Sequence, residues 1–247
     1  MRKPLLLATF GFILILVFML VLWPARVAVG WFLPANVALS GVTGTVWQGS
    51  ASQLSIDGHV IGGLTWDARS LSVLSGSPRW QIELRRPAGF VRADVAVSTT
   101  GSVQVSDLTA ASPLQGVADL VPLAGTDGNL TVNLPTLALE QGQLTALSGQ
   151  IVVDALSPMG LADVNLGTLE LMLPADQTPP FSGSLSALDG PLLVEDGRLE
   201  LAANGSYTIS GRVKARDDAP DNIRQGIQFL GTPDPLGFYP FLQRGSL

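Results

Sequence analysis

Residues 80–85 of this 247-residue chain read WQIELR, and the alternation of apolar and polar side chains in this stretch decides the fold. In an extended strand, Trp80, Ile82 and Leu84 would point to one face of a sheet and the polar residues between them to the other. A period of two is typical of an antiparallel strand that has one buried face and one face in water. The stretch therefore predicts such a strand.

The same alternation recurs outward from this stretch, at residues 90–97, 130–134, 169–173 and 207–214. Pairs of residues that tolerate positive φ, and so favour tight hairpin turns, lie between the apolar runs. These pairs are Asp57-Gly58, Asp127-Gly128, Asp189-Gly190, Asp196-Gly197 and Asn204-Gly205. The sequence thus predicts an all-β, antiparallel fold. Its apolar face could be covered in a closed barrel, a sandwich or an open curved gutter, and the pattern favours none of the three.

Two segments depart from the period of two. Residues 113–121 could form one or two helical turns, and residues 217–230 predict a short helix near the C-terminus. The second segment combines the usual start, stripe and stop signals of a helix. They are acidic Asp217, Asp218 and Asp221, Pro220 in the first turn, the apolar stripe Ile223, Ile227 and Leu230, and Gly231 at the end.

The N-terminal region carries an uncharged apolar run, LLLATFGFILILVFMLVLW, at residues 5–23. As a helix it would span about 28 Å, which is close to the thickness of the hydrocarbon core of a bilayer. The run is long and ends in bulky residues without a small-residue cleavage site, so we expect a retained anchor rather than a signal peptide. Arg2 and Lys3 predict a cytoplasmic N-terminus, and Trp23, Trp31 and Phe32 suit the opposite interface.

These features predict a bitopic membrane protein in three parts. Residues 1–23 form a cytoplasmic stub and a single transmembrane helix, residues 24–35 a juxtamembrane linker, and residues 36–247 a β-rich domain. In a Gram-negative cell, that domain lies in the periplasm. The net charge of the chain is −6; without Arg2 and Lys3, 12 basic residues face 20 acidic ones, so the exported part carries −8. This acidic balance is a poor fit to nucleic acid.

The residues that commonly carry out catalysis or bind metals are sparse in this chain. His59 is the only histidine, it follows the predicted turn at residues 57–58, and there is no cysteine. A zinc site or a serine–histidine triad would therefore lack donors. The carboxylate pairs Glu195-Asp196 and Asp217-Asp218 fall at predicted turn or helix-start positions, where acidic residues have a structural role. We expect no enzymatic activity, no catalytic, cofactor-binding or metal-binding residues, and no cofactor.

Two groups of motifs resemble one protein family across nearly the whole chain. The first group is LSGVTGTVWQG at residues 39–49, followed by LTW at 64–66 and LSVL at 71–74. The second is YTISG at 207–211, APDNI at 219–223, LGTPD at 230–234, GFY at 237–239 and the final GSL. With one N-terminal anchor, the chain resembles the type II secretion system protein N family. It departs from the family pattern at Phe238, where a basic residue is expected.

The resemblance implies an inner-membrane accessory component of the machine that exports folded proteins across the outer membrane. It implies action by protein contacts, with subunits of the inner-membrane platform and with the secretin or its connector subunit, and it transfers no catalytic residue. Independently of the resemblance, Gly41 and Gly44 are expected to allow close backbone approach around a short strand. Trp47 and Trp66 are expected to be core or inter-sheet anchors, and residues 231–235 a rigid exit from the C-terminal helix.

Two functional hypotheses follow. In the first, the protein is an assembly factor of the type II secretion system that docks partners through exposed strand edges or loops. In the second, it is a periplasmic lipid-binding or lipid-transfer protein whose curved sheet holds acyl chains in an apolar groove. An apolar content of 47% with only 6% aromatic residues suits an aliphatic groove, and it suits an ordinary β-core equally well.

Overall fold

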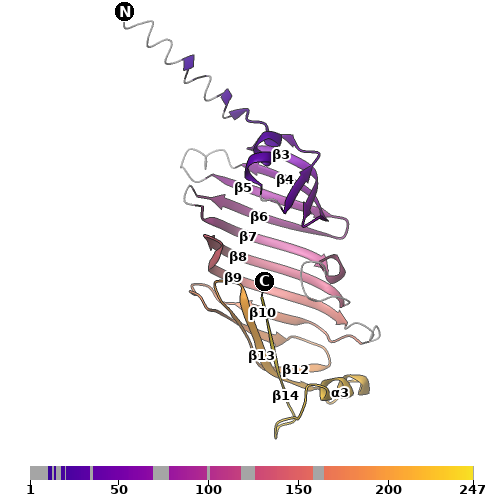
Figure 1. The fold of residues 1–247 in the computed structure, drawn as a ribbon. Coiled ribbons are helices and arrows are strands. Elements are labelled where there is room, and N and C mark those ends of the chain that lie inside the picture. The colour runs from indigo at the N-terminus through magenta and orange to yellow at the C-terminus, as the bar shows by residue number, and fades with distance from the viewer. Residues whose placement is uncertain are drawn as a thin grey trace, which may run out of the picture. The chain divides into compact units, whose positions relative to one another are not determined.

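The computed structural model describes residues 11–12, 14, 18–19, 21–33, 36–68, 78–98, 101–117, 126–157 and 164–246. The chain divides into two compact units, Met1–Pro87 and Ala88–Leu247, here called unit 1 and unit 2. Both are built from antiparallel strands (Figure 1). The prediction of an all-β antiparallel fold is therefore confirmed.

Unit 1 is a small sheet preceded by a helix. Its elements are α2 (Ala25–Phe32), β1 (Val37–Ser40), β2 (Thr43–Gly44), β3 (Gln48–Ile56), β4 (His59–Ala68) and β5 (Arg79–Arg86). β3 pairs with β1, β2 and β4, and β4 pairs with β5. The predicted turn at Asp57-Gly58 connects β3 to β4, and both residues adopt the positive φ (50° and 83°) that such a turn requires.

Unit 2 is a single sheet in which each strand pairs with the next along the chain (Figure 1). Its strands are β6 (Gly89–Val97), β7 (Val103–Pro113), β8 (Asp127–Glu140), β9 (Gln143–Ser157), β10 (Leu169–Leu173), β11 (Phe181–Ala187), β12 (Leu192–Leu201), β13 (Ser206–Ala215) and β14 (Tyr239–Ser246). The short 3-10 helix η1 (Leu114–Val117) follows β7, and helix α3 (Asp221–Gln228) lies between β13 and β14.

The two faces of this sheet differ in chemistry, because the period of two in the sequence separates their side chains. The face here called the inner face carries the main buried cluster, which comprises Leu134, Leu147, Leu173, Phe181, Leu199 and Leu201. A second buried cluster packs α3 against the inner face at the C-terminal end of unit 2. It comprises Val164, Leu192, Val213, Ala219 and Ile223. The opposite, outer face carries polar residues such as Thr131, Asn133, Arg198, Glu200 and Arg212.

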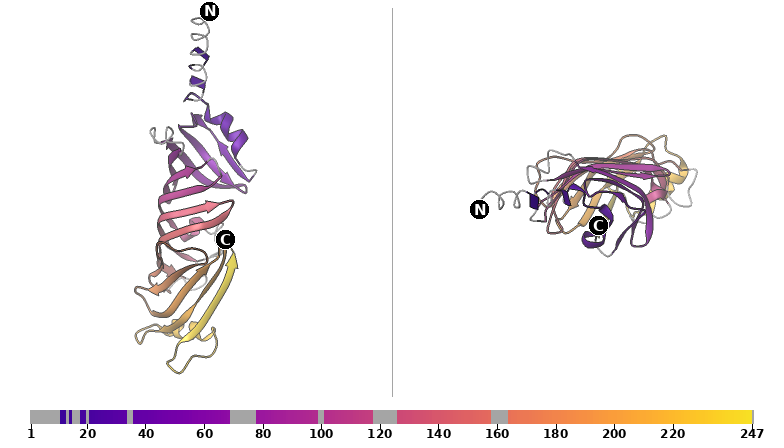
Figure 2. Two further views of the ribbon diagram at one scale, coloured as in Figure 1. Left: turned by 90° about the vertical axis from the view of Figure 1, so that its left-hand side faces the viewer. Right: turned by 90° about the horizontal axis from the view of Figure 1, so that it is seen from above.

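Of the three coverings that the sequence left open, the open sheet fits the described part of unit 2. Its strands form one sheet, so they do not make a sandwich, and β6 and β14 at its two ends do not pair with each other. Figure 2 shows that this sheet is curved. A pocket that is lined by residues of every strand from β10 to β14 shows that the inner face is concave there.

Several predicted boundaries need correction. Asp127-Gly128 and Asp196-Gly197 are not hairpin turns, because both lie inside strands at β-bulges. The C-terminal helix is shorter than residues 217–230: Pro220 precedes its first turn, and Leu230 lies beyond its end and is 46% exposed. In the segment 113–121, helical structure is limited to the 3-10 turn η1, and residues 118–121 lie outside the described residues.

Most of the predicted anchor, residues 5–23, also lies outside the described residues. Within the described part of the chain, no helix has both the length and the apolar character needed to cross a membrane. The predicted linker, residues 24–35, contains helix α2, whose Ala25 is buried. The chain next to α2 bonds to the connection between β2 and β3, since Val46 N donates to Trp23 O at 3.1 Å.

Candidate interaction surfaces

The motif GTVWQG at residues 44–49 forms a tight connection from β2 to β3, and three tryptophans hold this connection in place within unit 1. Thr45 closes the connection, because its Oγ1 accepts hydrogen bonds from the N–H groups of Trp47 (3.3 Å) and Gln48 (3.2 Å). Trp66 Nε1 donates to Thr45 O at 3.0 Å, and Trp80 Nε1 donates to Val46 O at 3.1 Å. The two indole N–H groups therefore fix the backbone of the motif.

The aromatic rings and the glycines of this connection pack closely together. Trp47 stacks on Trp80 with ring centroids 6.5 Å apart and planes 7° from parallel. A Cβ atom at Gly49 would lie 2.5 Å from the ring of Trp66, so only glycine fits beneath that ring. A Cβ at Gly44 would lie 2.4 Å from Gln48 O, which agrees with the predicted close backbone approach. Trp47 and Trp66 are half-buried, and their contacts described here are to their own unit.

A second cluster of interacting side chains lies on the outer face of unit 2, around the β-bulge in β12. Glu195 pairs with Arg212 in register, but Arg198 pairs with Ser210, so β12 contains one extra residue between these points. Asp196 adopts φ 52° there. The bulge interrupts the alternation of side chains and lets two consecutive carboxylates, Glu195 and Asp196, reach the same outer-face cation.

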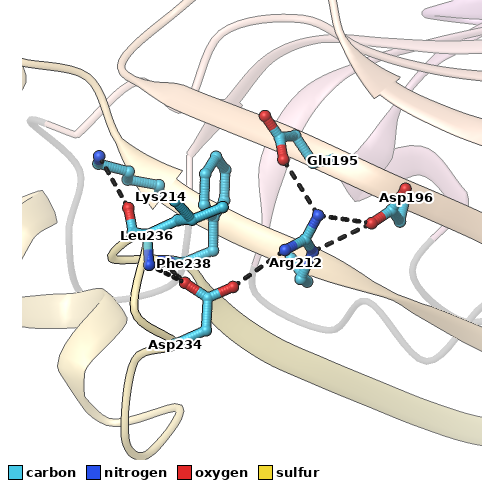
Figure 3. A network of polar contacts seen from close by, with 7 residues as sticks. All are labelled: Glu195, Asp196, Arg212, Lys214, Asp234, Leu236 and Phe238. Carbon is cyan, nitrogen blue, oxygen red and sulfur yellow. Dashed lines mark hydrogen bonds and ion pairs between the residues drawn. The ribbon is translucent and has the colours of Figure 1, made fainter.

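That cation is Arg212 of β13, which contacts three carboxylates (Figure 3). Its Nη2 lies 2.7 Å from Asp196 Oδ2 and 3.2 Å from Glu195 Oε2, and its Nη1 lies 3.0 Å from Asp234 Oδ2. The hydrogen bonds to Asp234 and Asp196 raise the pKa of the Arg212 guanidinium. The Arg212 network is our name for Arg212, Glu195, Asp196, Asp234 and the two residues whose N–H groups donate to Asp234, namely Leu236 and Phe238.

Asp234 organises the segment that returns from α3 to β14, as was predicted for residues 231–235. Its Oδ1 accepts the N–H groups of Leu236 and Phe238, each at 2.9 Å. The N–H of Phe238, the guanidinium of Arg212 and the N–H of Leu236 together lower the pKa of Asp234. The carboxylate therefore ties this segment to β13 and, through Arg212, to the bulge in β12.

Phe238, at the position where the resemblance led us to expect a basic residue, is buried in this network. The guanidinium carbon of Arg212 lies 5.4 Å from the centre of its ring, and Lys214 Nζ lies 5.6 Å from it. Lys214 Nζ also donates to Leu236 O at 3.1 Å. A basic side chain at position 238 would meet two cations, whereas the face of an aromatic ring attracts them.

The inner face of unit 2 carries a pocket of about 600 Å³ at its C-terminal end. The pocket is lined by Leu169, Leu185, Leu192, Val194, Val213, Phe229, Leu230, Pro240, Phe241, Leu242 and Gln243. Gln243 has the one polar side chain among them. Phe229, just beyond α3, is 93% exposed, the largest exposed fraction of any large apolar residue in the described part of the chain. An apolar pocket beside an exposed aromatic ring is typical of a contact surface.

The other candidate residues from the sequence lie apart from these surfaces. His59 is exposed at the start of β4, beside the turn at residues 57–58, as predicted. Asp217 and Asp218 lie in an exposed turn before α3, and the main-chain oxygen of Asp217 accepts a hydrogen bond from Arg224. Within the described ranges, no three His, Cys, Asp or Glu residues come close enough together to hold a metal ion.

Sequence reasoning missed the roles of Trp80, Arg212, Asp234 and Phe229. Trp80 was assigned only to a strand, although its N–H needs an acceptor wherever the ring is buried. Arg212 could not be linked to Glu195-Asp196 while those residues were assigned to a turn.

The fold and the surfaces described above define a class of protein. It is an open antiparallel β-sheet with an apolar inner face, a polar outer face and a C-terminal strand whose start is held by the Arg212 network.

Comparison with known proteins places the chain in a family. It matches the family described as "Type II secretion system (T2SS), protein N" over residues 35–242, and it therefore belongs to that family, as the sequence motifs indicated. Family membership makes it a type II secretion component.

The similarity to two relatives covers most or all of the chain, and the similarity to a third covers a short part of it. Over its full length, the chain is 28% identical to the type II secretion system protein N of Aeromonas hydrophila, all of which is covered. It is 24% identical to the protein of that name from Vibrio cholerae, with 91% of each chain covered. A relative from Aeromonas salmonicida is 36% identical over 47 residues, which are 19% of this chain and 100% of that sequence. No solved structure matches the chain.

Proposed function

We propose that this chain is a single-pass inner-membrane component of the type II secretion system whose β-rich part lies in the periplasm. It acts without catalysis, by contacts with subunits of the inner-membrane platform and with the secretin or its connector. The observation that carries the proposal is the family match over residues 35–242. The uncharged run at residues 5–23, preceded by Arg2 and Lys3, supports the anchor and its orientation.

The topology is tested by reporter fusions. A reporter that is active only in the periplasm should be active when fused after residue 247 and inactive when fused before residue 1. Activity in the opposite pattern would overturn the proposed orientation. Release of the β-rich part from washed membranes by carbonate would overturn the anchor.

Participation in secretion is tested by deletion and copurification. Deleting the gene should reduce export of the secreted enzymes and leave them folded in the periplasm. The full chain, purified from detergent-solubilised membranes, should carry platform subunits with it. Unchanged export together with the absence of any secretion subunit from the purified material would overturn the proposal.

A second candidate function, lipid binding or transfer, is supported by one observation: the apolar pocket on the inner face of unit 2. Its largely apolar lining would suit an acyl chain, since each buried methylene contributes about 0.8 kcal/mol. Native mass spectrometry of the detergent-extracted chain distinguishes the two candidates. Stoichiometric phospholipid without secretion subunits would favour lipid binding, whereas secretion subunits without lipid would favour the first proposal.

A further inference from the structure

β14 forms the last strand of unit 2, and within the described part of the chain one side of it has no partner strand. Its residues pair with β13 from Tyr239, opposite Val213, to Ser246, opposite Ser206. Among the described residues, no strand pairs with the other side of β14. The backbone N–H and C=O groups on that side therefore form an open row that another extended chain can bond to.

Pro240 indicates which residues of β14 contribute to this row. Proline has no N–H, so it fits an edge strand where its nitrogen points away from the neighbouring strand. Backbone direction alternates along a strand, so Leu242, Arg244 and Ser246 direct their N–H and C=O groups to the open side with Pro240. The side chains of Leu242 and Arg244 are exposed.

The open row runs beside the apolar pocket. Phe241 and Gln243, the inner-face residues of β14, line that pocket together with Phe229 and Leu230. A strand added to β14 would place every second side chain on the inner face, next to Phe241 and Gln243. The edge would supply hydrogen bonds, and the pocket would supply contacts for apolar side chains at alternate positions.

We propose that β14 is the docking edge for an extended segment of another type II secretion subunit, which continues the sheet and inserts apolar side chains into the pocket. This inference rests on the proposed function. A peptide fits the site better than an acyl chain does, because only a peptide carries the backbone donors and acceptors that can bond to the open row of β14. The Arg212 network fixes the start of β14 and so presents the edge in one geometry.

The first test is photo-crosslinking in cells that contain the whole secretion system. Phe229 is replaced by photoreactive benzoylphenylalanine, which preserves an aromatic ring at this exposed site. Phe90, 42% exposed on the outer face of β6, carries the same group as a control. The expected result is an adduct with another secretion subunit from position 229 and none from position 90. Adducts only with lipid or with a second copy of this chain would overturn the proposal.

The second test compares variants in copurification of the full chain from detergent. Leu242→Pro removes the backbone N–H of residue 242 from the open side of β14, whereas Leu242→Thr retains it. Phe229→Ser removes the exposed aromatic ring. Leu242→Pro and Phe229→Ser should each recover roughly tenfold less of the secretion subunits than the wild type, and Leu242→Thr should match it. Since Phe229 is 93% exposed, Phe229→Ser separates a binding defect from a folding defect.

The outcomes separate this inference from the function on which it rests. Recovery of secretion subunits by the wild type and equal recovery by Leu242→Pro and Phe229→Ser would overturn the docking edge and leave the proposed function in place. If the wild type recovers none, the docking edge is overturned, and the proposed function fails as well only when deletion of the gene also leaves export unchanged.

Discussion

Arg212 is the residue on which the outer face of unit 2 depends most, because one guanidinium contacts carboxylates from two separate segments. Glu195 and Asp196 come from the bulge in β12, and Asp234 comes from the segment before β14. Without the cation, three like charges would face one another. Such a shared partner couples the three sites, so single substitutions here will not be additive.

Arg212→Met tests this coupling. We expect faster proteolysis of residues 231–238 and a lower melting temperature than the wild type, because Asp234 loses its ion pair with β13 and Phe238 loses one of the two cations that lie over its ring. Limited proteolysis followed by mass spectrometry locates the cleavage. Arg198→Met is the matched control, since Arg198 lies on the outer face and forms no ion pair within the described residues. Equal cleavage of both variants would contradict the prediction.

The Asp234 carboxylate predicts a dependence of stability on pH. Its pKa in the folded state lies below the ordinary value of 3.8, so its contribution is complete above that value and is lost as the pH falls through the lowered pKa. Asp234→Asn should therefore be less stable than the wild type at neutral pH. The difference in melting temperature should shrink as the pH is lowered below about 4.

The measurement is a series of thermal melts from neutral to acidic pH, and it has its own control. Asp218→Asn removes a carboxylate from an exposed turn and should leave the wild-type profile unchanged. A gap between wild type and Asp234→Asn that stays constant down to the lowest pH would show that the charge of Asp234 is unimportant.

At the scale of elements, α3 is held by its apolar stripe rather than by its length. Ile223 is 5% exposed and packs in the cluster with Val213, whereas Phe229, just past the end of the helix, is 93% exposed. Ile223→Ala should lower the free energy of unfolding by about 2–4 kcal/mol through lost burial and a cavity. Phe229→Ala should change it by less than about 0.5 kcal/mol. Denaturant titration of both variants checks this contrast.

The strands of unit 2 also show how much of the fold could be predicted from the sequence. The alternation at Leu130, Val132 and Leu134 correctly placed those residues on the inner face. Asp196-Gly197 misled the prediction because a bulge and a hairpin turn both need positive φ and select similar residues. What separates them is long-range register: a Cβ at Gly197 would lie 2.1 Å from Leu185 O on the neighbouring strand.

The candidate surfaces were predictable only in part, for the same reason. The glycines and the tryptophan of GTVWQG indicated a special local structure, but its contacts to Trp66 and Trp80 are seen only in the structure. The Arg212 network joins residues 195, 196, 212 and 234. No local pattern links positions that far apart. Similarly, the stripe in the sequence extends the helix to Leu230, whereas α3 ends at Gln228 and Phe229 beyond it is exposed.

At the scale of the whole molecule, the separation of unit 2 into an apolar and a polar face should govern its tolerance of charge. Val132 and Thr131 are neighbours in β8 but lie on the inner and the outer face. Val132→Asp should lower the free energy of unfolding by more than about 2 kcal/mol, because a carboxylate would enter an apolar cluster without a partner. Thr131→Asp should be nearly neutral. Similar losses in both variants, measured by denaturant titration, would contradict the division into faces.

The order of strands in unit 2 has a consequence for how the chain reaches this structure. Every strand from β7 onward pairs with the strand made immediately before it, so no segment has to wait for a distant part of the sequence. Contacts between near neighbours in sequence favour rapid folding. The sheet can therefore grow strand by strand as the polypeptide emerges, and β14 is the last strand to be added.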